Sequence, residues 1–146
     1  MTSRFSELVI DAHDMRKLAE FWCSVLDYKV LYEEPDVIEI GPKDFDADPG
    51  PALVEQWKAR ARTGPPAPTI VFVSVPERKA VKNRIHIDVS PLGDHAEEVE
   101  RILALGATKA DIGQGDVKWV VMRDPEGNEF CVLRSLAPQI SGGGGI

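Results

Sequence analysis

The chain has 146 residues, of which 43% are hydrophobic and 28% are charged, and its formal net charge is -7. This composition is typical of one soluble globular domain with a core of its own. The negative charge argues against nucleic acid and anionic membranes as partners. No apolar run approaches the ~20 residues of a membrane span. We expect a cytoplasmic protein in which Cys23 and Cys131 are free, buried thiols.

Strand and helix patterns alternate along the first half. Residues 5–10 alternate as a strand does, and Asp14 is the predicted N-cap of a helix. The apolar residues of this helix recur at helical spacing: Met15, Leu18, Phe21, Trp22, Val25 and Leu26. Residues 28–33 and 37–40 predict two strands, and residues 69–75 predict a strongly apolar one. The first half therefore runs strand, helix, strand, strand, strand.

The second half opens with another strand pattern. Residues 84–89 alternate, which places Arg84, His86 and Asp88 on one face of the predicted strand. A helical pattern follows at residues 94–105 and stops at a glycine.

A hairpin ends the second half. Residues 117–122 and 129–133 are strand-like, and the turn signal Asp124-Pro125-Glu126-Gly127-Asn128 joins them. The order of strand, helix and strands is therefore written twice, at residues 4–76 and 83–135.

This repeat predicts an α+β fold made of two βαβββ modules. One helix shields only one face of a sheet, so we expect the modules to form a curved eight-stranded mixed sheet around a central cavity, with both helices outside. Residues 1–140 are predicted to be a single domain. An insertion at residues 42–68, with a short helix at 51–62, interrupts module one, and the glycine-rich tail 141–146 is expected to be disordered.

Three motifs carry a resemblance to a known superfamily. They are Leu18-Ala19-Glu20-Phe21-Trp22, the stretch at residues 81–88, and the ending Asp-Pro-Glu-Gly-Asn-Glu-Phe-Cys-Val-Leu at residues 124–133. With the duplicated unit, they resemble the vicinal oxygen chelate superfamily, which includes glyoxalases, extradiol dioxygenases and bleomycin-resistance proteins. The resemblance is strongest to bacterial glyoxalase-like proteins. Because this fold hosts many chemistries, it implies a fold more firmly than a reaction.

In metal-dependent members of this superfamily, the ligands come from the first and last strands of each module. The resemblance places Glu7 where a metal-binding histidine usually sits, and His86 at the matching position of module two. Val73 and Cys131 fall where a glutamate or similar ligand is expected, and valine cannot bind a metal. The resemblance therefore implies too few ligands for a closed metal site and no assigned cofactor, although water could complete a weakly bound divalent metal.

Glu7 and His86 are the candidate catalytic residues, and we expect the pseudo-twofold relation of the modules to bring them together in the cavity. The structural alternative is a hydrogen-bonded core histidine, with Glu7 paired to His86 or Arg84. His13 and His95 fall at the helix starts, away from the cavity.

Four residues are expected to line the ligand pocket: Arg84, Trp119, Glu129 and Cys131. Glu129 alternates onto the same face as Cys131, and its structural alternative is a salt bridge to Arg84 or Arg123. For Trp119 the alternative is a place in the core.

Two classes of function follow. The first is a small-molecule-binding glyoxalase-like protein of unassigned activity, not a fully metal-dependent glyoxalase. The alternative is a lyase, isomerase or dioxygenase-type enzyme that uses Glu7 and His86 as an acid–base pair or as metal ligands. Sheet edges and apolar surface also predict a homodimer, which this superfamily commonly forms.

Overall fold

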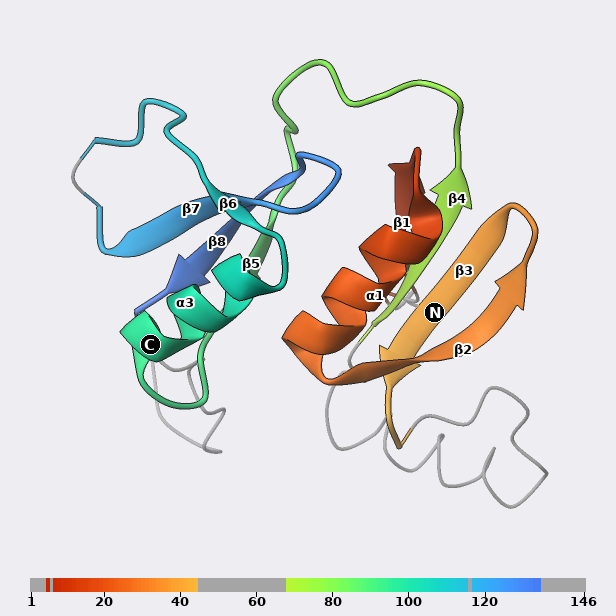
Figure 1. Ribbon diagram of the computed structural model, residues 1–146, viewed down its shortest axis with the longest axis horizontal. Coiled ribbons are helices and arrows are strands. Elements are labelled where there is room, and N and C mark those ends of the chain that lie inside the picture. The colour runs from red at the N-terminus through yellow and green to blue at the C-terminus, as the bar shows by residue number, and fades with distance from the viewer. Residues whose placement is uncertain (1–4, 6, 45–67, 116, 135–146) are drawn as a thin grey trace, which may run out of the picture. The chain divides into compact units, whose positions relative to one another are not determined.

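A computed structural model describes residues 5, 7–44, 68–115 and 117–134. The predicted helix at 51–62, most of the predicted insertion and the tail lie outside these residues. The chain divides into two compact units, residues 1–78 and 79–146, and each contains one four-stranded mixed sheet (Figure 1). The α+β class and the duplicated βαβββ order are therefore confirmed. Within the described ranges, no helix has the length and apolar character needed to cross a membrane.

The first unit follows the predicted order. Its elements are β1 (Glu7–Ala12), α1 (Met15–Leu26), β2 (Tyr28–Glu34), β3 (Val37–Pro42) and β4 (Thr69–Ser74). The strands lie in the order β1-β4-β3-β2. β1 runs parallel to β4, and the other pairs are antiparallel. Helix α1 carries the chain back across the sheet, so β2 starts in the same direction as β1. The two antiparallel steps from β2 to β3 and from β3 to β4 then leave β4 parallel to β1.

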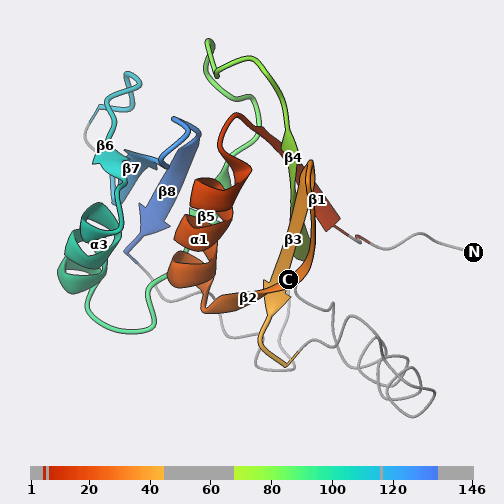
Figure 2. The same cartoon turned by 45° about the vertical axis from the view of Figure 1, so that its right-hand side comes forward.

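Helix α1 covers one face of this sheet (Figures 1 and 2). The side chain of Asp14 caps the helix by accepting a hydrogen bond from the main-chain N of Lys17 at 3.1 Å. Asp27 ends it in the left-handed region, with φ 57°. Four residues of α1 are buried: Leu18, Ala19, Phe21 and Trp22. They recur at the predicted helical spacing, so Trp22 is a core residue, as expected.

The second unit repeats this arrangement. Its elements are β5 (Ile87–Val89), α3 (His95–Ala104), β6 (Thr108–Lys109), β7 (Trp119–Arg123) and β8 (Glu129–Leu133). The strand order is β5-β8-β7-β6, which matches β1-β4-β3-β2 position for position. β5 again runs parallel to β8, while the other two pairs are antiparallel.

Helix α3 packs against β8 in the second sheet. Asp94 caps the helix by accepting hydrogen bonds from the main-chain N of Ala96 and Glu97, at 2.8 and 3.0 Å. α3 contacts β8, where Phe130 and Val132 are almost fully buried. Successive residues of a strand point to opposite faces. Those two residues therefore share one face of β8, and the residues that alternate with them share the other.

The structure corrects several predicted boundaries. β5 begins at Ile87, because residues 84–85 form a bend, so the strand predicted at 84–89 is too long. The first strand lies at Glu7–Ala12 instead of residues 5–10, and β7 lies at Trp119–Arg123 instead of residues 117–122. The eight-stranded fold implied a strand between α3 and β7, but the position of the two-residue strand β6 was not predicted, because two residues show no periodicity.

Candidate functional site

The face of β8 that points away from Phe130 and Val132, called here the open face, carries Glu129 and Cys131. Glu129 and Cys131 alternate with Phe130 and Val132, so they project from the face opposite the buried pair. Two strand partners extend this face. Asp88 of β5 pairs with Cys131, and Arg123 of β7 pairs with Glu129.

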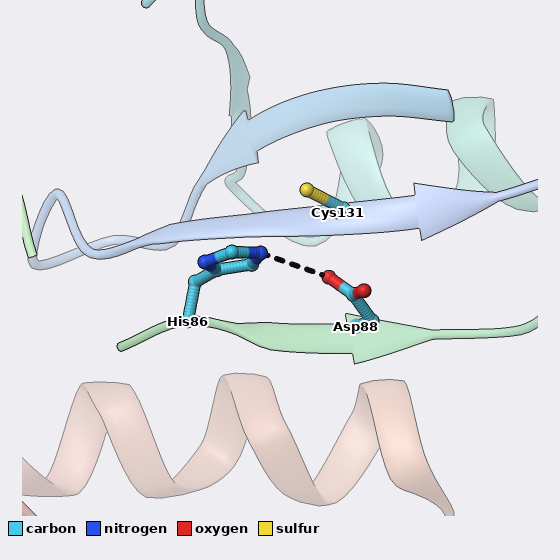
Figure 3. A group of neighbouring side chains, drawn as sticks. All are labelled: His86, Asp88 and Cys131. Carbon is cyan, nitrogen blue, oxygen red and sulfur yellow. Dashed lines mark ion pairs between the residues drawn. The ribbon is translucent and has the colours of Figure 1, made fainter. Parts of the chain in front are cut away.

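His86, Asp88 and Cys131 form a compact cluster on this face (Figure 3). His86 directly precedes β5, and its Nε2 lies 3.3 Å from Oδ1 of Asp88. One ring nitrogen, one carboxylate oxygen and the thiol sulfur all lie within 4.8 Å of one another. The His86 and Asp88 side chains are 45% and 46% exposed, whereas Cys131 is 7% exposed. A solute can therefore reach the cluster from the side of the imidazole and the carboxylate.

Burial raises the pKa of the Cys131 thiol to about 11. The negative charge of Asp88 and a hydrogen bond to it act in the same direction, while the Lys82 ammonium lowers this pKa. At neutral pH the group is therefore a neutral thiol. A nucleophilic cysteine needs a depressed pKa, so Cys131 is suited to packing and hydrogen bonding rather than to covalent catalysis.

The cluster also fits a divalent metal of borderline softness. Imidazole nitrogen, carboxylate oxygen and thiolate sulfur are the three ligand types that Zn²⁺ takes in proteins. The 3.3 Å between the His86 and Asp88 atoms is close to the separation of two ligands on one tetrahedral ion of that size. Cys131 would have to lose its proton, which weakens such a site at neutral pH.

Glu129 is the second polar centre of this face. The carboxylate is 6% exposed, and Oε1 accepts a hydrogen bond from Nζ of Lys79 at 2.9 Å. Oε2 accepts another from the main-chain N of Asn83 at 3.1 Å. Burial raises the pKa of Glu129, but the bonds from Asn83 and Lys79 outweigh it, and the net pKa lies below the ordinary 4.5. Glu129 is therefore a buried, ionised carboxylate.

The hairpin turn fixes this carboxylate in place. Oδ1 of Asp124 accepts hydrogen bonds from the main-chain N of Glu126 and Asn128, at 3.0 and 2.9 Å. Gly127 completes the turn with φ 87°, a conformation that glycine adopts without strain. Nδ2 of Asn83 donates to Oδ1 of Asn128 at 2.9 Å, which ties the segment before β5 to the turn.

A cavity of about 500 Å³ opens beside Glu129, within the second unit. It is lined by Lys79, Ala80, Val81, Lys82, Ile112, Arg123, Gly127 and Glu129. This volume lies in the range typical of small-molecule sites, about 300–1,000 Å³. Lys82 is also one of the charges that act on Cys131, so the cavity and the cluster are neighbours.

The structure places the predicted pocket residues at different points. Glu129 lines the cavity, and Cys131 belongs to the cluster. Trp119 opens β7 with 41% of its surface exposed, so the alternative of a core tryptophan is wrong. Arg84 is exposed in the bend before β5.

Glu129 has two cationic partners, and one of them is among the two considered. A salt bridge to Arg84 or Arg123 was the structural alternative: Arg123 does form a long ion pair with Glu129, and Lys79, which was not considered, supplies the closer cation. Nε of Arg123 stays 4.0 Å from Oε1 of Glu129, which is beyond hydrogen-bonding distance.

The candidate catalytic residues belong to different units. Glu7 is an exposed residue at the start of β1, and His86 lies in the second unit. Their proximity stays a prediction. His95 is the first residue of α3, as expected, and its Nε2 lies 3.3 Å from the main-chain O of Val132.

The burial pattern also corrects one position inferred from the superfamily. Cys131 lies between two buried residues of β8, Phe130 and Val132. In β4 the equivalent place between two buried residues belongs to Val71. Val71 rather than Val73 therefore corresponds to Cys131, and the conclusion that this position lacks a metal ligand is unchanged.

Several site residues were missed in the sequence. Asp88 was seen on the His86 face, and its two-residue spacing from His86 was the signal that could have selected it. Lys79 and Lys82 lie in a charged connector without periodicity. No local pattern connects Lys79 with a carboxylate 50 residues away.

Comparison with known families gives one match that covers most of the chain. The family model described as "Glyoxalase-like domain" matches residues 7–133. No protein with a curated description matches.

Several solved structures have a similar fold. A glyoxalase/bleomycin resistance protein/dioxygenase family enzyme from Burkholderia phytofirmans PsJN is 17% identical, with a TM-score of 0.57, and the match covers 89% of this chain and 97% of that one. For the fosfomycin resistance protein FosX from Mesorhizobium loti, the identity is 14%, the TM-score 0.60 and the coverage 92% and 94%. A bleomycin-binding protein complexed with bleomycin is 10% identical, with a TM-score of 0.51 and coverage of 91% and 99%. These likenesses show the glyoxalase fold.

Proposed function

The chain belongs to the glyoxalase-like domain family, and from this premise we propose that it binds a small molecule on the open face of its second sheet. The cavity of about 500 Å³ beside Glu129 carries the proposal. It combines a ligand-sized volume with a few fixed polar groups, as small-molecule sites do. The adjacent His86–Asp88 pair supplies exposed hydrogen-bonding groups. Two structural neighbours, named for bleomycin binding and fosfomycin resistance, support a ligand of drug-like size.

The experiment is a fragment screen on the full chain, followed by amide NMR spectra. Binding in the cavity is expected to move the amide signals of Val81, Lys82 and Gly127, which line it. His86→Ala is expected to weaken ligands that reach the cluster, whereas His13→Ala serves as the control. Hits that perturb only amides outside the second unit, or no hits at all, would contradict the proposal.

A second candidate is a lyase, isomerase or dioxygenase-type enzyme that uses Glu7 and His86 as an acid–base pair or as metal ligands. The three donor atoms of His86, Asp88 and Cys131, all within 4.8 Å, favour its metal-assisted form. A bound divalent metal would polarise an oxygen of the substrate. His86, Asp88 and Cys131 would hold the ion through one donor atom each.

Metal analysis separates the two candidates. The protein is incubated with Zn²⁺ or Mn²⁺, dialysed, and assayed for bound metal. One tightly held ion per chain, lost in Asp88→Asn and in Cys131→Ser, would favour the enzyme. Weak or substoichiometric metal in the native chain would favour binding without metal chemistry.

We further propose that the protein is a cytoplasmic homodimer. Its free thiols, Cys23 and Cys131, support a reducing compartment. Exposed apolar side chains on the strands, such as Val9, Val30 and Tyr32, support self-association.

A further inference from the structure

The cavity beside Glu129 is unusually rich in cations for so acidic a protein. Three of its lining side chains are Lys79, Lys82 and Arg123, and one is a carboxylate, whereas the whole chain carries a net charge of -7. A local patch of the opposite sign attracts anions against the overall field of the protein. We infer that this cavity binds the oxyanion of a small organic acid, a carboxylate or a phosphate ester, through Lys82 and Arg123. The inference rests on the proposed function and names its ligand class.

The only carboxylate in the lining is already neutralised. Glu129 is buried, and its two oxygens accept hydrogen bonds from Lys79 Nζ and from the main-chain N of Asn83. The opposite charges of Lys79 and Glu129, 2.9 Å apart, largely cancel at the distance of a bound ligand. Lys79 therefore serves Glu129, and two positive charges remain to face the cavity.

Lys82 is the first of these two charges. Its Nζ donates to the main-chain O of Asn83 at 3.1 Å, and across the described residues no carboxylate lies within ion-pairing distance of it. An ammonium has three donors, so two N–H groups are available for a ligand. Its charge already reaches the interior of the site, because it lowers the pKa of Cys131.

Arg123 is the second charge. Its side chain is 41% exposed, and Nε stays 4.0 Å from the nearest oxygen of Glu129. This ion pair is too long for a hydrogen bond, so the N–H groups of the guanidinium stay available for a ligand. A planar guanidinium binds carboxylate or phosphate through two parallel hydrogen bonds. An ammonium and a guanidinium on one cavity form a suitable pair for one oxyanion.

The remaining lining restricts the rest of the ligand. Ala80, Val81, Ile112 and Gly127 offer small or apolar surface. A volume of about 500 Å³ exceeds what a bare inorganic anion needs, so it accommodates an apolar body attached to the anionic group. A small organic acid has both parts.

The test compares a charged probe with its neutral isostere on the full chain. Benzoate and benzamide share one shape and differ in charge, and inorganic phosphate tests the anion alone. Amide NMR titrations are expected to show benzoate binding about tenfold more tightly than benzamide, as a charge-assisted contact allows. The shifts should centre on Val81, Lys82 and Gly127, and the benzoate affinity should fall with added salt.

Two variants and one control assign the binding groups. Lys82→Gln and Arg123→Gln are each expected to weaken benzoate about tenfold while leaving benzamide unchanged. Lys109→Gln removes an exposed lysine of β6 that does not line the cavity, and it should leave both probes unchanged. Thermal unfolding of each variant establishes that it is folded, and Lys82→Gln, at an exposed position, is expected to unfold as the native chain does.

The outcomes separate this inference from the proposed function. Equal binding of benzoate and benzamide at the cavity amides would overturn the anion assignment and leave a small-molecule site. An unchanged benzoate affinity in both variants would overturn it as well. If neither benzoate nor phosphate shifts the amide signals of the cavity while neutral fragments do, the anion inference fails and the proposed function stands. If neither anions nor neutral fragments shift these signals, both the inference and the proposed function fail.

Discussion

Asp88 lies directly opposite Cys131 across the parallel pair β5–β8. This one register position joins an exposed carboxylate to a buried thiol, and the carboxylate helps to keep the proton on the sulfur. Burial is the larger cause of the raised pKa, and Asp88 adds its charge and a hydrogen bond. The pairing therefore makes the chemical state of Cys131 depend on a residue that solvent can reach.

The first prediction concerns the reactivity of this thiol. In a Cys23→Ser background, Asp88→Asn removes the negative charge, so the pKa of Cys131 should fall. Each unit of that fall increases the thiolate fraction about tenfold at a pH below the pKa. We expect iodoacetamide to alkylate Cys131 several-fold faster in the variant, as followed by mass spectrometry at fixed pH. Glu100→Gln, at an exposed position of α3, is the control. Equal rates in all three proteins would contradict the role given to Asp88.

The sequence predicted the parts of this site that lie within one regular strand. Alternation placed Glu129 and Cys131 on one face of β8. The apolar spacing and the Asp14 cap predicted α1, and a helical pattern with a glycine stop predicted α3. Alternation works there because β8 is paired on both sides and cannot change its register without exposing buried side chains.

Other parts depend on contacts that no local pattern records. Lys79 reaches Glu129 from 50 residues away, through a connector that has no secondary structure. β5 is shorter than its sequence pattern, because residues 84–85 form a bend. His86 nevertheless stays close to Asp88, since the two are only two residues apart. Specific long-range partners are set by packing, which a single sequence does not encode locally.

The second prediction concerns Glu7 and His86. If the two modules bring these side chains to one ligand, Glu7→Gln and His86→Ala should each weaken binding of a ligand identified in the fragment screen by about tenfold or more. His13→Ala and His95→Ala should change it little. Isothermal titration calorimetry on the four variants measures the difference. If His86→Ala binds the ligand normally, His86 is not part of the site. If only Glu7→Gln binds it normally, the site lies within the second unit.

The third prediction concerns assembly. A homodimer would cover exposed strand residues, and its mass would be twice the 16.1 kDa of one chain. Light scattering over a concentration series is expected to give the dimer mass throughout the micromolar range. Val30→Lys places a charge on an exposed residue of β2 and should weaken association if that surface is used. A single-chain mass at every concentration would contradict the dimer.

The last prediction concerns the buried pair of Lys79 and Glu129. Lys79→Met leaves an ionised carboxylate without its cation, and such a loss should lower the free energy of unfolding by about 1–3 kcal/mol at neutral pH. Urea denaturation measures this change. Arg101→Gln breaks the exposed pair with Glu98 on α3 and serves as the control, with an expected loss of at most about 1 kcal/mol.

The direction of the pKa shift of Glu129 predicts how the stability difference between the native chain and Lys79→Met changes with pH. The pKa of Glu129 is lowered in the folded state from the ordinary 4.5, so its ionised form stabilises the fold at every pH above that value. This contribution is lost as the pH falls below 4.5 and through the lower, folded-state pKa, because the unfolded chain then binds the proton first. In Lys79→Met the pKa of Glu129 should be higher than in the native chain, because burial still raises it while the lowering effect of Lys79 is gone. The stability gap between native chain and variant should therefore narrow on acidification, and a gap that stayed constant from neutral pH to pH ~3 would contradict the ion pair as its cause.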